Sequence, residues 1–279
     1  MICLNGTEIK FSHFPNGETH VPDIDPTNLA DGSPHKIDFS YESDDDLLHL
    51  WFLAHHLEWN RCLYINYLPY SRMDRKVGNS VFTLRAVVDL INKMAFHSVK
   101  IVEPHSDVAT QLIARSEALM VSSYLVPRWV MPEIEFNTSL DWLVFPDEGA
   151  QKRYGGVDGP IAPTLVGNKT RDFQTGKITG LTISTPACER VNGESQALIW
   201  DDLCSRGGTF MSAGQQLKDM GFGRVVLYVT HMEQTVLDGP LLDDDSPIDA
   251  VYCTDTMPWV NTWYVPKLHV FHQSEALAL

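Results

Sequence analysis

The chain has 279 residues, of which 44% are hydrophobic and 20% are charged, and its formal net charge is −15. The composition is that of a globular protein, the length predicts two domains of about 140 residues each, and the acidic balance argues against nucleic acid as a partner. Because the N-terminus lacks the flanks of a signal peptide and no apolar run approaches the roughly 18 residues of a membrane span, we expect a cytoplasmic protein without a membrane partner.

Extended apolar segments alternate with helical patterns along the chain. The sequence predicts helices at 46–59, 80–96 and 209–221, and strands at 61–68, 98–104, 141–146, 177–185, 196–200, 223–230 and 249–256. This alternation predicts an α/β fold with mainly parallel sheets and flanking helices. A proline-containing stretch at 127–141 predicts a domain join, giving domains 1–135 and 136–279. The glycine- and proline-rich stretch 154–176 is expected to be irregular, as a mobile lid or an ordinary surface connection.

A phosphate-binding turn is predicted after the strand at 196–200. Gly207 and Gly208 allow backbone conformations and close approaches that a β-carbon forbids. Thr209 follows at the predicted helix start, where free amides and the helix dipole favour an anion. The adjacent Asp201 and Asp202 would repel a phosphate unless they face another part of the ligand, such as ribose hydroxyls or a metal. A ribose phosphate satisfies both requirements.

Seven motifs recur in the order found in one known family: FPNGE at 14–18, YLPYSRMDRK at 67–76, EPHSD at 103–107, FPDEGAQKR at 145–153, KTR at 169–171, WDDLCSRGGT at 200–209 and VTH at 229–231. With them the chain resembles the ribose-phosphate diphosphokinases, also called PRPP synthetases. The resemblance implies two phosphoribosyltransferase-type, Rossmann-like domains and assembly of identical subunits into a homo-oligomer. It also implies transfer of the β,γ-diphosphate of MgATP to the C1 hydroxyl of a ribose 5-phosphoryl acceptor, with release of AMP.

The resemblance assigns a role to each matching position. It implies that ATP is bound by Phe14, Asn16, Glu18, Arg72 and Asp74, that Mg²⁺ is held by His105 and Asp147, and that Lys169 and Arg171 close over the transferring phosphates. It further implies that Asp201 and Asp202 bind ribose hydroxyls or a second metal. The 5-phosphate would be held by Ser205, Arg206, Gly207, Gly208 and Thr209.

Departures from the family pattern leave alternatives open. Asn16 replaces an aspartate and Met73 replaces a glutamine, so two nucleotide contacts differ. The loop reads SRGGT where the family generally reads DTGGT, which makes it two charge units more positive and favours ADP-ribose as the acceptor over ribose 5-phosphate. The alternatives are ordinary ribose 5-phosphate, a noncatalytic nucleotide- or partner-binding relative, and a phosphoribosyltransferase. The acidic run Asp44–Asp46 is explained as a helix start capped by Ser43.

Overall fold

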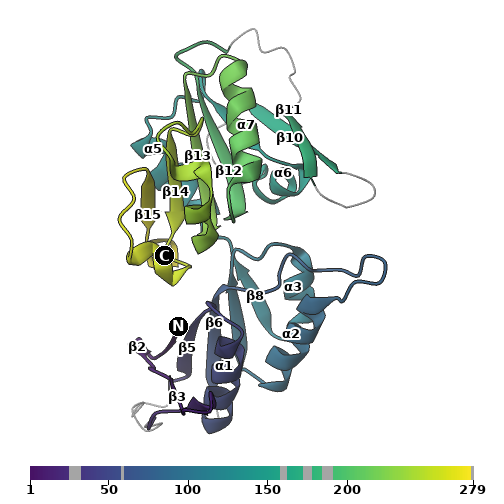
Figure 1. Cartoon of the computed structure of the whole chain (residues 1–279), viewed down its shortest axis with the longest axis vertical. Helices are drawn as coiled ribbons and strands as arrows, with labels where there is room; N and C mark the ends of the chain where they lie inside the picture. The colour runs from purple at the N-terminus through teal and green to yellow at the C-terminus, as the bar shows by residue number, and fades with distance from the viewer. Residues whose placement is uncertain (25–32, 58–59, 158–161, 172–177, 184–190, 278–279) are drawn as a thin grey trace. The chain divides into compact units, whose positions relative to one another are not determined.

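The computed structural model describes residues 1–24, 33–57, 60–157, 162–171, 178–183 and 191–277 (Figure 1). The chain forms two compact units, one comprising Met1–Met120 with Thr256–Pro258 and the other Val121–Asp255 with Trp259–Leu279. The first division falls at residues 120/121, earlier in the chain than the join expected from the prolines. The predicted α/β class with mostly parallel sheets is confirmed.

The first unit is built on a six-stranded sheet in the order β2-β1-β5-β6-β7-β8. Strands β5 (His35–Ser40), β6 (Arg61–Tyr67), β7 (Ser98–Val102) and β8 (Ser116–Leu119) are parallel, whereas β1 (Ile2–Leu4) and β2 (Thr7–Glu8) add an antiparallel edge. The helices are α1 (Asp45–His56), α2 (Thr83–Lys93) and α3 (Asp107–Leu112), and β3 (Ser12–His13) and β4 (Thr19–His20) form a separate hairpin. The helices bury apolar stripes, such as Leu84, Val88 and Ile91 of α2, against this sheet.

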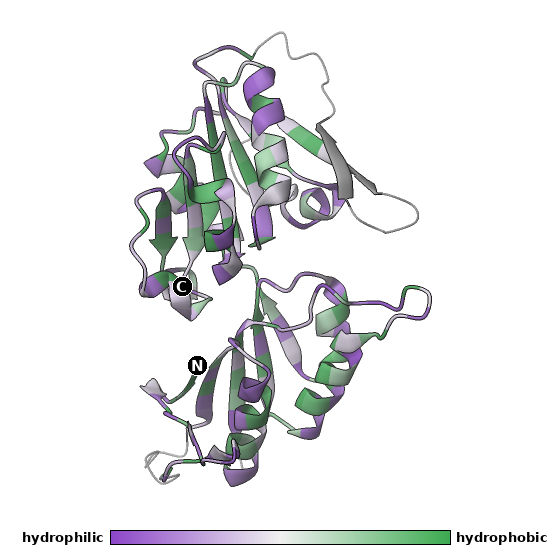
Figure 2. Ribbon diagram, in the orientation of Figure 1, coloured by the Kyte–Doolittle hydropathy of each residue, from purple (hydrophilic) through white to green (hydrophobic). Residues whose placement is uncertain are grey.

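The second unit is built on a seven-stranded sheet in the order β11-β10-β9-β12-β13-β14-β15. Its strands are β9 (Trp142–Phe145), β10 (Thr164–Arg171), β11 (Ile178–Ile183), β12 (Gln196–Cys204), β13 (Arg224–Met232), β14 (Ala250–Thr254) and β15 (Leu268–Phe271). Only the β10–β11 pair among these described strands is antiparallel. The central strands are apolar along most of their length (Figure 2), because helices cover both faces of such a sheet.

Short helical segments surround the second sheet. They are α4 (Ser122–Leu125), the π-helical turn Val126–Val130, α5 (Met131–Glu133), α6 (Glu148–Tyr154), α7 (Gly208–Asp219), the 3₁₀ turns Gln234–Asp238, Pro240–Leu242 and Pro258–Asn261, and α8 (Ser274–Leu277). Within the described residues, no helix combines the length and apolar character needed to cross a bilayer. Cys3, Cys62, Cys204 and Cys253 are free thiols, and Cys188 lies outside the described residues.

The three predicted helices and seven predicted strands are all present, with ends shifted by a few residues. Two local predictions are wrong. Residues 164–171 of the segment expected to be irregular form strand β10, and β12 continues through Asp201 and Asp202 to Cys204. The cap of α1 also differs, because Asp44 occupies the cap position without a side-chain capping bond, and the Asp46 carboxylate accepts hydrogen bonds from the backbone amides of Glu42 and Ser43.

Candidate active site

The order of strands in the second sheet locates a candidate ligand site. From β9 the chain moves through β10 to β11 on one side, and it then crosses to β12 and continues through β15 on the other. Open α/β sheets bind ligands at such a switch point, beyond the carboxyl ends of the two strands where the order reverses. Asp147 follows β9 and the 205–209 loop follows β12. The topology therefore directs these two predicted elements to the same edge of the sheet.

Asp147 stands at the start of α6. Its backbone is extended, and its Oδ1 accepts a hydrogen bond from the backbone amide of Ala150 at 2.8 Å, which makes it the N-cap of the helix. Capping satisfies a helix amide that would otherwise lack a partner. Asp147 therefore has a structural role in addition to the metal-binding role that the resemblance implies.

Asp201 and Asp202 lie within strand β12, not in the loop after it, and their exposed fractions are 9% and 3%. The Asp202 Oδ1 accepts a hydrogen bond from Arg153 Nη1 at 2.7 Å, and the same nitrogen lies 4.0 Å from Asp201 Oδ1. Burial alone would lower the pKa of the Arg153 guanidinium, but the interactions with Asp202, Tyr154 and Asp201 together outweigh burial and raise that pKa. The acidic pair is therefore partly neutralised by a cation from α6.

Sequence reasoning gave Arg153 no role, although it lies in the quoted FPDEGAQKR motif. The available signal was its position six residues after Asp147, on a helix that follows the strand next to β12. A buried acidic pair requires a compensating cation, and this requirement could have selected Arg153.

The 205–209 loop has the conformation expected of a glycine turn. Gly207 adopts φ +80° at the N-cap of α7, and a β-carbon there would lie 2.7 Å from Leu241 Cβ. Gly239 lies under the loop, since a β-carbon on it would lie 2.3 Å from the Arg206 carbonyl oxygen. The hydroxyls of Ser205 and Thr235 are 3.0 Å apart. Close packing at Gly207 and Gly239 and the Ser205–Thr235 hydroxyl pair thus fix the conformation of the loop.

The outer side of this loop is open. A β-carbon on Gly208 would meet no atom within 4 Å, so packing within the described residues gives no reason for a glycine at this position. The Arg206 side chain is exposed and makes no hydrogen bond or ion pair with the described residues. Thr209 is half-buried in the first turn of α7. The loop thus presents an accessible helix N-terminus to solvent.

Lys169 and Arg171 lie in strand β10, where Lys169 pairs with Leu181 and Arg171 with Ile178 of β11. The expected loop position of this basic pair is therefore wrong, because both backbones belong to an antiparallel ladder. The glycine- and proline-rich composition of 154–176 predicted irregular structure, although the segment contains a strand of eight residues. Their catalytic role stays a prediction.

The FPNGE motif forms the turn between β3 and β4 in the first unit. The Phe14 amide donates to the Glu18 carbonyl at 2.8 Å, and the Asn16 side-chain amide donates to Glu18 Oε2 at 2.8 Å. Phe14 is 49% exposed, and its ring meets that of His20 edge to face. The structure thus brings Phe14, Asn16 and Glu18 together on one exposed turn, with an aromatic ring available for stacking.

The other predicted residues of the first unit follow parallel strands. Arg72 is exposed and Asp74 is half-buried in the segment after β6, and His105 is half-buried in the segment after β7. Adjacent parallel strands end at the same edge of a sheet, so both segments start from that edge. No group of three or more His, Cys, Asp or Glu side chains suited to a metal was found among the described residues.

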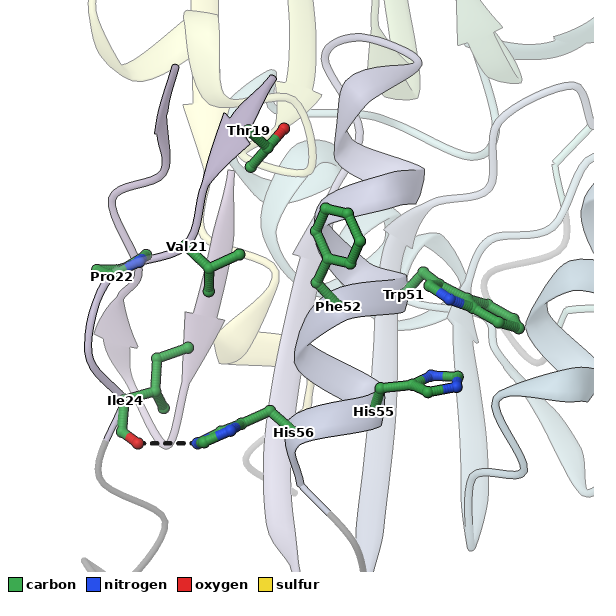
Figure 3. A pocket seen from close by; sticks show the side chains of 8 residues that line it. All are labelled: Thr19, Val21, Pro22, Ile24, Trp51, Phe52, His55 and His56. Carbon is green, nitrogen blue, oxygen red and sulfur yellow. Dashed lines mark hydrogen bonds between the residues drawn. The ribbon is translucent and has the colours of Figure 1, made fainter. Parts of the chain in front are cut away.

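Three pockets lined by described residues contain none of the predicted site residues. The pocket in the first unit has a volume of about 510 Å³ and lies between helix α1 and strand β4 with the segment that follows it (Figure 3). It is lined by Thr19, Val21, Pro22, Ile24, Trp51, Phe52, His55 and His56. His56 Nε2 lies 2.9 Å from the Ile24 carbonyl oxygen and closes one end of it. In the second unit, a pocket of about 180 Å³ lies beside Tyr154 and Trp200, and one of about 540 Å³ lies beside Arg128, Lys152 and Arg153.

No protein-family model matches the chain. Curated relatives nevertheless align over most of it. A ribose-phosphate pyrophosphokinase of Pyrococcus furiosus is 24% identical over 263 residues, which cover 90% of this chain and 87% of the relative. One of a Marinomonas species is 26% identical over 203 residues, 70% of this chain, and the aligned part is less than two thirds of the relative, at 60%. The chain is a homologue of the ribose-phosphate pyrophosphokinases. This relation confirms the predicted family and its class, an enzyme.

A solved structure independently confirms the fold expected of a ribose-phosphate pyrophosphokinase homologue. The phosphoribosylpyrophosphate synthetase of Mycobacterium smegmatis matches with a TM-score of 0.78 at 20% identity, and the match covers 97% of this chain and 88% of that one. Such a match over nearly the whole chain includes both units and supports the prediction of two phosphoribosyltransferase-type domains.

Proposed function

We propose that the chain is a Mg²⁺-dependent diphosphokinase that transfers the β,γ-diphosphate of ATP to the C1 hydroxyl of a ribose 5-phosphoryl acceptor. The hydroxyl oxygen would form a bond to the β-phosphorus, the bond between that phosphorus and the α,β-bridging oxygen would break, and AMP would leave. The observation that carries the proposal is the open glycine loop at the switch point of the second sheet, in a homologue of enzymes named for this chemistry.

The 205–209 loop supports binding of the acceptor phosphate. Gly207 turns the chain into α7, and the open space at Gly208 allows a phosphate oxygen to approach the backbone closely. The hydroxyls of Ser205 and Thr209 can donate further hydrogen bonds. A side chain at position 208 would occupy the space that the phosphate needs.

The acidic pair supports binding of the ribose. Because Arg153 donates to Asp202, the repulsion between the Asp202 and Asp201 carboxylates is reduced. Asp201 can therefore stay ionised and accept hydrogen bonds from the vicinal hydroxyls of a ribose. The pair precedes the phosphate loop on the same strand end, so one acceptor molecule can meet both groups.

The donor set suits Mg²⁺, which takes oxygen ligands and is usually held by one or two carboxylates together with substrate phosphates. Asp147 would supply a carboxylate oxygen and His105 would bind directly or through water. The ion would neutralise charge that develops on the transferring diphosphate. Lys169 and Arg171 would stabilise the same charge, and Phe14, Asn16, Glu18, Arg72 and Asp74 would bind ATP.

We further propose ADP-ribose as the acceptor, with ribose 5-phosphate as the second candidate. The observation that favours ADP-ribose is the exposed Arg206 side chain, which adds a cation where a second phosphate on the 5-position would emerge. The names of the curated relatives favour ribose 5-phosphate. The product from ADP-ribose would carry a diphosphate on C1 and would belong to NAD-related metabolism.

A mass-resolved assay with MgATP tests the proposal, offering ADP-ribose and ribose 5-phosphate separately and following AMP and the diphosphorylated acceptor. We expect both products from ADP-ribose, and Arg206→Thr should reduce use of ADP-ribose more than use of ribose 5-phosphate. Product only from ribose 5-phosphate would reject the acceptor assignment. ATP binding with no AMP from either acceptor would favour a noncatalytic relative, and consumption of an activated ribose with a base would favour a phosphoribosyltransferase.

A further inference from the structure

The segment between β6 and α2 contains a strained residue close to its start. Tyr70 adopts φ +61°, a left-handed conformation that is rare for a bulky side chain. Its carbonyl accepts a hydrogen bond from the Met73 amide at 2.9 Å, closing a turn around Ser71 and Arg72. Backbone strain of this kind persists only where surrounding contacts enforce it, and it is common at functional sites.

The Tyr70 side chain makes a contact that can hold this conformation. Its hydroxyl donates to Asp44 Oδ1 at 2.5 Å, and the Tyr41 hydroxyl donates to the same oxygen at 2.7 Å. The two rings lie 6.4 Å apart in an edge-to-face arrangement. Hydrogen bonds from Tyr70 and Tyr41 lower the pKa of the Asp44 carboxyl, so it is ionised at neutral pH and both bonds are charge-assisted.

Asp44 is available for this contact because it does not perform the capping role expected from its position before α1. The side chain makes no capping bond, and the backbone amides of Asp46 and Leu47 donate to the carbonyl oxygens of Ser43 and Asp44. The carboxylate instead joins α1 to the segment that carries Arg72 and Asp74. The acidic run that sequence analysis explained as a helix start therefore contacts a predicted nucleotide-binding motif.

We propose that Asp44 is a positioning residue for the nucleotide: by holding Tyr70 in its left-handed conformation, it fixes the turn that presents Arg72 to the ATP phosphates. This inference rests on the proposed function, because it assigns ATP to the same segment. Asp44 does not touch the substrate. Its effect reaches ATP through Tyr70 and the Tyr70–Met73 turn.

A double-mutant cycle on ATP affinity tests the inference, with Tyr70→Phe, Asp44→Asn and the double variant, and with calorimetric titration of a non-hydrolysable ATP analogue. Loss of one charge-assisted hydrogen bond should raise the Kd about tenfold in each single variant, and the double variant should bind no more weakly than the weaker single one. The melting temperature and the affinity for the acceptor should stay near those of the wild type. Tyr64→Phe, which removes a phenol hydroxyl from strand β6 of the same sheet, is the matched control and should leave the Kd unchanged.

Each other outcome is decisive. Unchanged ATP affinity in Tyr70→Phe, or additive losses in the double variant, would overturn the inference and leave the proposed function standing. Equal loss of affinity for ATP and acceptor would indicate a general structural role and overturn it as well. A wild-type protein that does not bind the ATP analogue would overturn both. If Asp44→Asn fails to fold, Tyr70→Phe alone still decides, because it removes one hydroxyl and no charge.

Discussion

Asp147 combines a helix cap with a proposed metal ligand, and these two roles depend on different properties of its side chain. Capping needs only a hydrogen-bond acceptor, which aspartate, asparagine and serine all provide. Binding Mg²⁺ needs a negatively charged oxygen. A neutral acceptor at this position therefore separates the two roles.

Replacing Asp147 by asparagine should preserve folding and abolish most of the activity. Because the Ala150 amide keeps an acceptor, we expect the free energy of unfolding to change by less than about 0.5 kcal/mol, whereas Asp147→Ala should cost about 1 kcal/mol. Turnover in both variants should fall by roughly a hundredfold or more. Urea denaturation and the AMP-release assay measure the two effects, and an active Asp147→Asn enzyme would remove this carboxylate from the metal site.

His272 provides a pH-dependent contact near the end of the chain. Its Nδ1 lies 2.8 Å from Asp255 Oδ2, and this hydrogen bond, followed by the charge of Asp255, raises the pKa of the imidazole. Because the pKa is higher in the folded state, the contact stabilises fully below the unfolded pKa near 6.5 and is lost as pH rises through the folded value. The imidazole is largely exposed, so we expect less than about 1 kcal/mol. Urea midpoints of wild type and His272→Gln should differ at pH 5.5 and converge by pH 8.5; a constant difference would contradict this assignment.

At the scale of elements, the turn into α7 contains two glycines with different reasons for being glycine. Gly207 has a left-handed backbone, and a β-carbon on it would overlap Leu241, whereas a β-carbon on Gly208 would face open space. The first is required by the protein itself. The second is required only if a ligand approaches its backbone.

Alanine at each position should therefore have opposite consequences. Gly207→Ala should destabilise the protein by about 2–3 kcal/mol, through left-handed strain and overpacking against Leu241. Gly208→Ala should leave stability unchanged or slightly higher, because alanine favours a helix, while the acceptor KM rises about tenfold or more. Thermal melts and acceptor kinetics distinguish the two, and a Gly208→Ala enzyme with the wild-type acceptor KM would place the phosphate elsewhere.

Elements with a strong apolar pattern of their own could be predicted from the sequence. Elements whose extent depends on contacts with residues distant in the sequence could not. Helix α2 buries apolar residues at helical spacing and strand β13 is a short, almost continuously buried apolar run, so both could be predicted from their own residues. Strand β12 extends past Trp200 because Arg153, distant in sequence, compensates the buried Asp201 and Asp202. Strand β10 is held by pairing with β9 and β11, which overrides the glycine- and proline-rich composition around it.

At the scale of the whole molecule, ordered motifs predicted the two-unit α/β fold and most candidate site residues. The strand order, and with it the switch point between β9 and β12, could not be predicted from local patterns, because it depends on which apolar faces meet in three dimensions. The contact between Asp44 and Tyr70 was hidden for the same reason, since the two residues are 26 positions apart. Sequence motifs thus predicted the family and a set of candidate residues, and the structure added the contacts that hold these residues in place.

The predicted nucleotide motifs lie in the first unit, whereas the predicted phosphate loop and basic pair lie in the second. Arg72→Ala should therefore raise the ATP KM about tenfold or more and change the acceptor KM little, because Arg72 belongs to the first unit.

Lys169→Ala should instead lower kcat by roughly a hundredfold with an ATP Kd close to that of the wild type, since the proposed contact strengthens as charge develops on the transferring group. Steady-state kinetics with each substrate varied, together with ATP titration, measure both. Lys169→Gln, which keeps the length of the side chain without its charge, should be as slow as Lys169→Ala, and normal turnover in either would exclude Lys169 from the transfer step.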